Sequence, residues 1–69
     1  MKRQSVSSSN LASIGYDAEN EILEVEFNHG GVYQYFDVPE DVYDELMEAP
    51  SHGVYFSANI RKDYEFKKL

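Results

Sequence analysis

The spacing of hydrophobic residues changes once along the chain, near residue 38, and this change limits the possible fold more than any other feature. Between Leu11 and Phe36, apolar residues recur at every second position. That spacing predicts strands, because successive side chains of a strand point to opposite faces. The segment VPED, residues 38–41, then indicates a helix start, since proline suits the first helical position and carboxylates complement the positive helix N-terminus. Strands followed by helices predict an α+β domain.

The first half of the chain predicts a three-stranded antiparallel meander. Its strands are residues 12–17 (ASIGYD), 22–27 (ILEVEF) and 32–36 (VYQYF). In the first turn, Asp17 is placed to accept hydrogen bonds from nearby backbone amides, and Asn20 tolerates a left-handed conformation. In ILEVEF, Leu23, Val25 and Phe27 share one face and the two glutamates the other. One face of the meander is therefore expected on a core and the other in solvent.

Two helices are predicted after the strands. Apolar residues at helical spacing form the buried stripe of the first helix: Val42, Tyr43, Leu46 and Met47. Pro50 ends this helix, and Ser51 is placed to cap a second one over residues 52–60. The tail DYEFKKL alternates weakly. The predicted fold is therefore a three-stranded antiparallel β-meander packed on two C-terminal helices, with a short C-terminal arm or edge strand.

A chain of 69 residues is predicted to be one domain spanning residues 1–69, with residues 1–5 and 67–69 flexible. The absence of cysteine excludes a disulfide and a thiolate metal site. Six tyrosines and four phenylalanines must therefore supply much of the core. Since the sequence also has no apolar stretch typical of a signal peptide or a membrane span, we expect a cytoplasmic protein.

The formal charge of −7 is unevenly distributed. All six lysines and arginines lie outside residues 4–60, whereas eleven of the thirteen acidic residues lie within that range. Most of the surface therefore repels a polyanion, which argues against strong nonspecific binding of nucleic acid unless the two basic ends meet in space.

The tyrosine pair in VYQYF, Tyr33 and Tyr35, has two possible environments. If residues 28–30 form a three-residue loop with a left-handed glycine, both tyrosines lie opposite apolar residues of the preceding strand and belong to the core. If the loop instead closes between Phe27 and Val32, both lie opposite glutamates and form an exposed ledge. The core arrangement is favoured, because a small domain needs the buried area of these rings.

Several short motifs agree in order and spacing with a known family: SSSNLASIGYD, LEVEF, GGVYQYFDVPEDVY, APSHGVYFSANIR and the late Tyr64. Together they resemble the KTSC domain, a small module named after the C-terminus of some lysyl-tRNA synthetases and also found as stand-alone bacterial and phage proteins. The Tyr-any-Tyr motif of that family corresponds to Tyr33-Gln34-Tyr35. The resemblance covers nearly the whole chain and implies RNA binding, because the module is attached to a synthetase.

The candidate binding residues are the tyrosines and the basic residues of the second half. They are Tyr33, Tyr35, Tyr55, Arg61, Lys62, Tyr64, Lys67 and Lys68. With Lys2 and Arg3 they would form one basic and aromatic patch if the chain termini lie close together.

No residue pattern predicts catalysis, a cofactor or a metal site. His29 and His52 each lack a second ligand at suitable spacing, and the serines at 7–9 lack a base partner. Glu24 and Glu26 are expected to be the solvated side of a strand rather than an acid pair. Two hypotheses follow: a non-catalytic module that binds an unknown protein, which is favoured, or an RNA-binding module that uses the basic termini and tyrosines.

Overall fold

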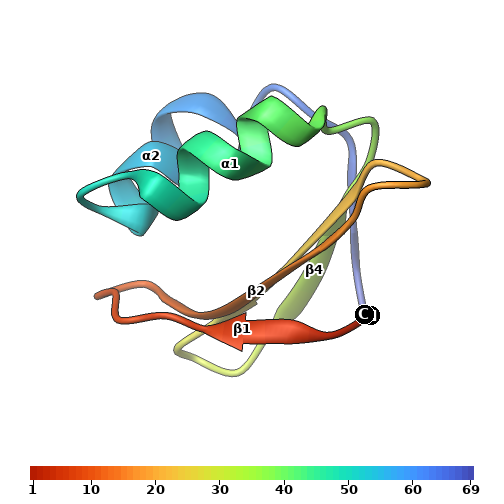
Figure 1. Cartoon of the computed structure of the whole chain (residues 1–69). Coiled ribbons are helices and arrows are strands. Elements are labelled where there is room, and N and C mark those ends of the chain that lie inside the picture. The colour runs from red at the N-terminus through yellow and green to blue at the C-terminus, as the bar shows by residue number, and fades with distance from the viewer.

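A computed structural model describes all residues, 1–69, and shows two helices covering one face of a five-stranded antiparallel sheet (Figure 1). The elements are β1 (Arg3–Ser5), β2 (Leu11–Asp17), β3 (Ile22–Phe27), β4 (Val32–Tyr35), α1 (Glu40–Glu48), α2 (His52–Asn59) and β5 (Phe66–Lys68). The strands lie in sequence order, and each pairs antiparallel with the next. The α+β class is confirmed.

The prediction of three strands was incomplete, because the sheet has five. β1 was missed because its sequence, RQS, has no apolar alternation, and all three residues are exposed. The tail forms β5, so of the two forms predicted for it the edge strand is present. Residues 1–5 and 67–69, expected to be flexible, thus contribute to the two edges of the sheet, and their mobility stays a prediction.

The β3–β4 hairpin has the register that places the tyrosines on the core side. Val25 lies opposite Tyr33 and Leu23 opposite Tyr35. Gly30 has a φ of 103°, a conformation that side chains rarely adopt, and its N–H donates to the carbonyl of Phe27 at 2.9 Å. The three-residue loop over residues 28–30 and the core position of Tyr35 are therefore confirmed.

The β2–β3 turn differs from the prediction by one residue. As expected, the Asp17 carboxylate accepts hydrogen bonds from the backbone N–H groups of Glu19 and Asn20. The left-handed residue, however, is Glu21, with a φ of 55°, and not Asn20. The side-chain amide of Asn20 instead donates to Asp17, so asparagine stabilises this turn through its side chain.

Both helices begin and end close to the predicted residues. Pro39 occupies the N-cap of α1, one residue before the position expected for it. The Ser51 hydroxyl caps α2 by accepting a hydrogen bond from the N–H of Val54 at 3.3 Å. A side chain at position 53, early in α2, would be crowded, because its Cβ would lie 3.1 Å from the side-chain nitrogen of Asn10. Glycine at this position allows the β1–β2 loop to approach the helix.

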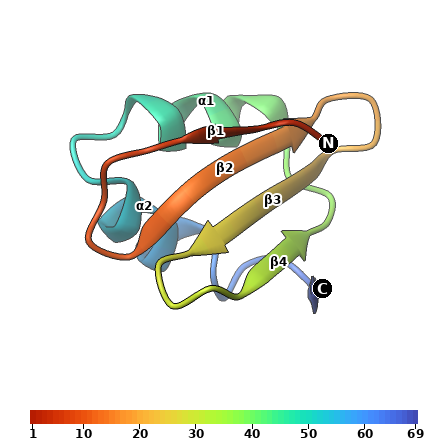
Figure 2. The same ribbon diagram turned by 90° about the horizontal axis from the view of Figure 1, so that it is seen from below.

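The core lies between the helices and the inner face of the sheet. Its buried apolar residues are Leu11, Ile14, Leu23, Val25, Tyr35, Val38, Leu46, Phe56 and Ile60. Seen from below, α1 lies behind β1 and β2, and α2 lies behind the beginning of β2, next to the end of β3 (Figure 2). The inner faces of β4 and β5 extend beyond this cover, so an incompletely buried aromatic surface is left at that edge.

Candidate binding cleft

Five aromatic rings line a cleft of about 640 Å³ where β3, β4 and β5 meet the end of α2. The rings belong to Phe27, Tyr33, Tyr35, Phe56 and Phe66. They form a closed cycle in which neighbouring ring centroids are 5.3 to 5.9 Å apart. Phe66 is 55% exposed at the mouth, whereas Tyr35 is 3% exposed at the floor. The cleft is within the size range of small-molecule and side-chain binding sites.

The tyrosine hydroxyls in this cleft have no hydrogen-bond partner within the protein. Every buried side-chain polar atom of the chain has a partner, so the unbonded hydroxyl of Tyr35 must reach solvent in the cleft. Burial and the neighbouring Tyr33 raise the pKa of Tyr35, and the charge of Arg61 opposes this rise. Tyr35 therefore stays protonated and offers a donor at the floor of the cleft, near a guanidinium.

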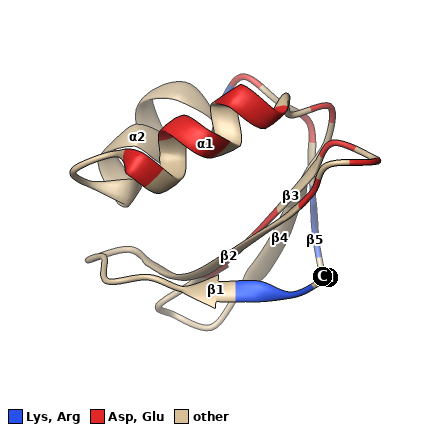
Figure 3. Ribbon diagram, viewed as in Figure 1, with Lys and Arg blue, Asp and Glu red and all other residues tan.

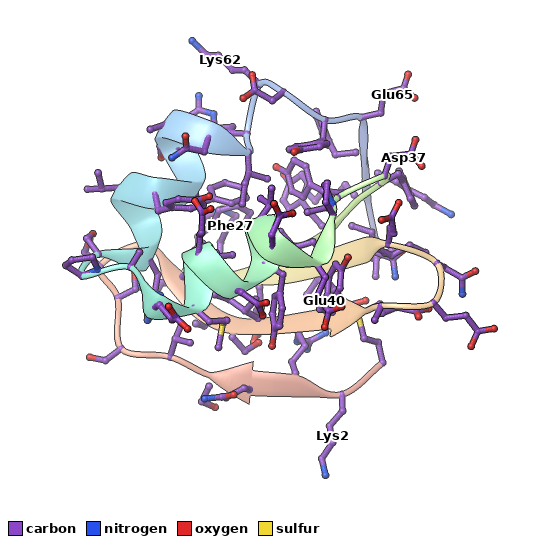
Figure 4. All side chains as sticks on the ribbon, turned by 45° about the horizontal axis from the view of Figure 1, so that its top comes forward. Lys2, Phe27, Asp37, Glu40, Lys62 and Glu65 are labelled. Atoms are coloured by element: carbon purple, nitrogen blue, oxygen red, sulfur yellow. The ribbon has the colours of Figure 1, made fainter.

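The polar rim of the cleft contains two cations that have no ion-pair partner within the protein. Arg61 and Lys62 line it, and neither makes an ion pair, since both salt bridges of the chain involve Arg3. Lys62 projects outward from the segment after α2 (Figure 4). His29 stacks on Phe27 with a centroid distance of 5.4 Å. Asn10 completes the rim, and its side-chain amide makes no hydrogen bond.

No carboxylate lines the cleft. The acidic residues are concentrated on α1 and around the β2–β3 turn, whereas α2 has no charged residue (Figure 3). A shallow uncharged groove follows the exposed face of α2 and includes Val54, Ser57 and Ala58. It shares Asn10 and Ser57 with the cleft. The cleft and this groove therefore form one continuous surface that lacks negative charge.

The structure divides the candidate binding residues into two groups. Tyr33, Tyr35, Arg61 and Lys62 line the cleft. The other four do not line it: Tyr55, Tyr64, Lys67 and Lys68. Lys68 lies opposite Tyr33 on the neighbouring strand, while Lys67 lies opposite Gln34 on the other face of the sheet.

Tyr55 lies outside the cleft and contributes to the packing of the two helices. Its hydroxyl donates to a carboxylate oxygen of Glu45 at 2.9 Å and so connects α2 to α1. Burial, this hydrogen bond and the charge of Glu45 raise the pKa of Tyr55 to about 12. Tyr64 is half-buried and close enough to Tyr55 to contribute to that rise.

Sequence reasoning missed six of the residues that line the cleft: Asn10, Phe27, His29, Phe56, Ser57 and Phe66. Phe27 was assigned to the core face of its strand, and Phe56 was counted among the phenylalanines expected to supply the core. The position of Phe66 follows from the pairing of β5 with β4, which places it opposite Tyr35. The alternation of the tail was a signal for this strand, although it did not identify the pairing partner.

The two basic ends do not form one patch around the tyrosines. Lys2 and Lys62 project from opposite sides of the molecule (Figure 4), and β1 and β5 are opposite edges of the sheet. Arg3 and Lys68 do line a common groove of about 540 Å³ beside the β3–β4 turn. Arg3 is already engaged there, because it forms an ion pair with Glu24.

The outer face of the sheet contains a polar network that the sequence did not predict. Arg3 donates hydrogen bonds to Ser13 and Glu24, and Gln34 donates to the other oxygen of Glu24 at 2.9 Å. Ser13 in turn donates to Glu26 at 2.9 Å. The expectation that Glu24 is solvated was wrong, since it is 6% exposed beneath these partners.

The environment of Glu24 favours its ionised form. Burial opposes ionisation, but the hydrogen bonds from Gln34 and Arg3 and the charge of Arg3 outweigh it and hold the pKa of Glu24 below its usual value. This network joins β1 to β2, β3 and β4, so it stabilises the edge that lacks apolar contacts.

No group of three or more histidine, aspartate or glutamate side chains is placed to hold a metal ion. Neither helix has the length and apolar character that crossing a bilayer requires.

Comparison with known proteins connects this architecture to one family. The model of the KTSC domain matches residues 7–64, which contain β2 to β4 and both helices. A crystal structure of a KTSC domain protein from Yersinia pestis superposes with a TM-score of 0.96 at 43% identity, covering 99% of this chain and 96% of that one.

Two sequence relatives differ in how much of their length is matched. An uncharacterized protein from Stutzerimonas stutzeri is 51% identical over 57 residues, which are 83% of this chain and 80% of that protein. A lysine–tRNA ligase from Nostoc punctiforme is 36% identical over 59 residues, which are 86% of this chain and 10% of the ligase. The chain thus spans about a tenth of that ligase.

Proposed function

Because this chain belongs to the KTSC domain family, we propose that it is a non-catalytic binding module that takes a protein partner into the aromatic cleft. The observation that carries the proposal is the combination of a closed aromatic cycle with unpartnered polar groups. The hydroxyls of Tyr33 and Tyr35 and the cation of Arg61 border the same space, and none is bonded within the protein. Groups left free in this way are available to a ligand.

A protein partner is favoured by the charge and continuity of the surface. The net charge of −7 repels a long polyanion along its whole length, whereas a short acidic segment needs only the local cations at the rim of the cleft. The cleft continues into the uncharged groove along α2, where Val54 is 69% exposed. Apolar and aromatic surface with a small charged rim is typical of the centre of a protein interface. Residues 1–69 are proposed to act as one domain, since both helices and the central strands share a single core.

The proposal is tested by titrating three probes against the labelled protein and following its backbone amide signals by NMR. The probes are a short end-capped peptide with the core Glu-Glu-Phe-Glu, a lysine-rich peptide of the same length, and a single-stranded RNA oligonucleotide. We expect the acidic peptide to shift the amides of the cleft, and the variant Phe66→Ala to weaken its binding about tenfold.

Leu69→Ala is the matched control, because Leu69 is also an exposed apolar residue beside β5. Equal loss of affinity in Phe66→Ala and Leu69→Ala would contradict the proposed site. Binding of the acidic peptide away from the cleft would contradict it as well.

RNA binding is the second candidate, and a specific observation supports it. Arg61, free of ion pairs, lies at the rim of exposed rings on which a base could stack. The six basic residues are divided among separate regions, so few phosphates are neutralised at once. We expect weak binding with a slope of log affinity against log salt of about −2 to −4. Submicromolar, sequence-selective RNA binding at physiological salt would replace the protein hypothesis.

A further inference from the structure

We propose that the partner docks as an extended acidic segment that pairs with the free edge of β5 and inserts an aromatic side chain beside Phe66. This inference rests on the proposed function, because it takes the cleft as the binding site. It adds the backbone geometry and the chemical class of the partner. Such strand addition obtains affinity from main-chain hydrogen bonds and specificity from alternate side chains.

The backbone of β5 has one bonded side and one free side. The N–H of Leu69 donates to the carbonyl of Val32 at 2.8 Å, and the carbonyl of Glu65 accepts from Phe36 at 2.9 Å. Because backbone groups alternate in direction along a strand, the N–H and C=O groups of Phe66 and Lys68 point away from β4. No further strand follows β5 in the sheet, so these groups are unpaired.

The side chains of β5 connect this free edge with the cleft. Phe66 lies opposite Tyr35 and Lys68 opposite Tyr33, on the face of the sheet that carries the aromatic cycle. The Phe66 ring centroid is 5.5 Å from that of Tyr35 and 5.9 Å from that of Tyr33. A strand added to the edge would place its inward side chains next to Phe66, at the mouth of the cleft.

The charge of the edge selects an acidic partner. Lys67 and Lys68 project to opposite faces of β5 and make no ion pair, and Arg61 and Lys62 lie at the adjoining rim. Lysine on a short edge strand disfavours pairing with an apolar strand, which would desolvate the charge, and repels a basic one. A second copy of this chain is also disfavoured, because its other free edge, β1, follows Lys2 and begins with Arg3. Glutamates opposite the lysines of β5 remove this repulsion.

The test compares two substitutions at one position, using the peptide with the core Glu-Glu-Phe-Glu. In antiparallel pairing, its phenylalanine stands opposite Phe66, and the two glutamates before it stand opposite Lys68 and Lys67. Lys68→Gln removes the charge and retains the outward N–H, whereas Lys68→Pro removes both. Proline is tolerated on an edge strand where its missing N–H faces solvent, so the amide spectrum of Lys68→Pro should keep its native dispersion.

We expect Lys68→Pro to bind the peptide about tenfold more weakly than Lys68→Gln. Proline removes one main-chain hydrogen bond and keeps the peptide backbone from approaching β5 closely. We also expect hydrogen exchange at the Phe66 amide of the parent to slow when the peptide binds. Equal affinity of the two variants would overturn the edge pairing, while sensitivity to Phe66→Ala would leave the proposed function intact. If the parent binds the RNA or the lysine-rich peptide at the cleft and not the acidic one, the partner class is wrong.

Discussion

The tyrosines at the two ends of the inner face are used differently. At the α1 end, Tyr16 stacks on Tyr43 at a centroid distance of 4.7 Å and donates its hydroxyl proton to the carbonyl of Val38. At the β5 end, Tyr33 and Tyr35 pack in the aromatic cycle, but their hydroxyls bond to nothing in the protein. The hydrogen bond of Tyr16 closes the first end, whereas the second end is open. An internal hydrogen bond of the hydroxyl therefore distinguishes Tyr16 from the candidate binding residues Tyr33 and Tyr35.

The largest expected effect tests whether the open end is also part of the core. Tyr35→Ala removes a ring that is 3% exposed and contacts Phe56 and Phe66. Loss of a buried aromatic ring should lower the free energy of unfolding by about 3 to 5 kcal/mol, enough to unfold most of so small a domain. Circular dichroism during heating measures this, and a variant that melts like the parent would show that the ring belongs to the surface.

A smaller effect tests whether the polar network stabilises the sheet independently of either tyrosine group. Arg3→Ala leaves the buried Glu24 without its cation, while Gln34 remains bonded to it. Because Arg3 is itself partly exposed, we expect the variant to lose about 1 to 2 kcal/mol of unfolding free energy. Urea denaturation at neutral pH measures this loss, and an unchanged midpoint would contradict a stabilising role for the network.

The same network predicts how the free energy of unfolding depends on pH in the acidic range. The folded-state pKa of Glu24 lies below the value of 4.5 for the free side chain, so the unfolded state takes up the proton first as pH falls. The contribution of Glu24 is therefore complete above about pH 4.5 and is lost as pH falls through the lower folded-state pKa. The free energy of unfolding, measured between neutral and acidic pH, should fall less steeply in Glu24→Gln than in the parent. Parallel curves would contradict the prediction.

The smallest effects sharpen the contrast between the tyrosine groups directly. Tyr16→Phe removes a hydroxyl bonded to the Val38 carbonyl and should cost about 1 kcal/mol. Tyr35→Phe removes a hydroxyl without an internal partner and should change stability by less than about 0.5 kcal/mol. Urea denaturation of both variants measures the difference. The contrast fails if Tyr35→Phe is the more destabilising of the two.

The local pattern of the sequence was sufficient for part of the fold. Periodicity and turn chemistry predicted the meander, both helices and the side of the sheet on which Tyr33 and Tyr35 lie. They missed β1, because RQS pairs through its backbone and a polar network, and such pairing has no hydrophobic signature. Burial of Glu24 was missed for the same reason, since it depends on an arginine from another strand.

The candidate site was predictable only in part, because it is assembled from distant segments. Tyr33, Tyr35, Arg61 and Lys62 could be selected by residue type. Their association with Phe66 requires the β4–β5 pairing, which no local pattern specifies. Clefts formed between strands and helices depend on such long-range pairing, whereas turns and helix caps are encoded within a few residues.

The most direct test of the open end as the binding site measures the affinity of the Glu-Glu-Phe-Glu peptide for Tyr35→Phe and Tyr16→Phe by isothermal titration calorimetry. Both variants lose one hydroxyl and keep the ring. We expect Tyr35→Phe to bind several-fold more weakly than the parent, because a hydroxyl facing the cleft is lost. Tyr16→Phe should bind with the affinity of the parent. Unchanged affinity in Tyr35→Phe, or a larger loss in Tyr16→Phe, would contradict the assignment of the open end as the binding site.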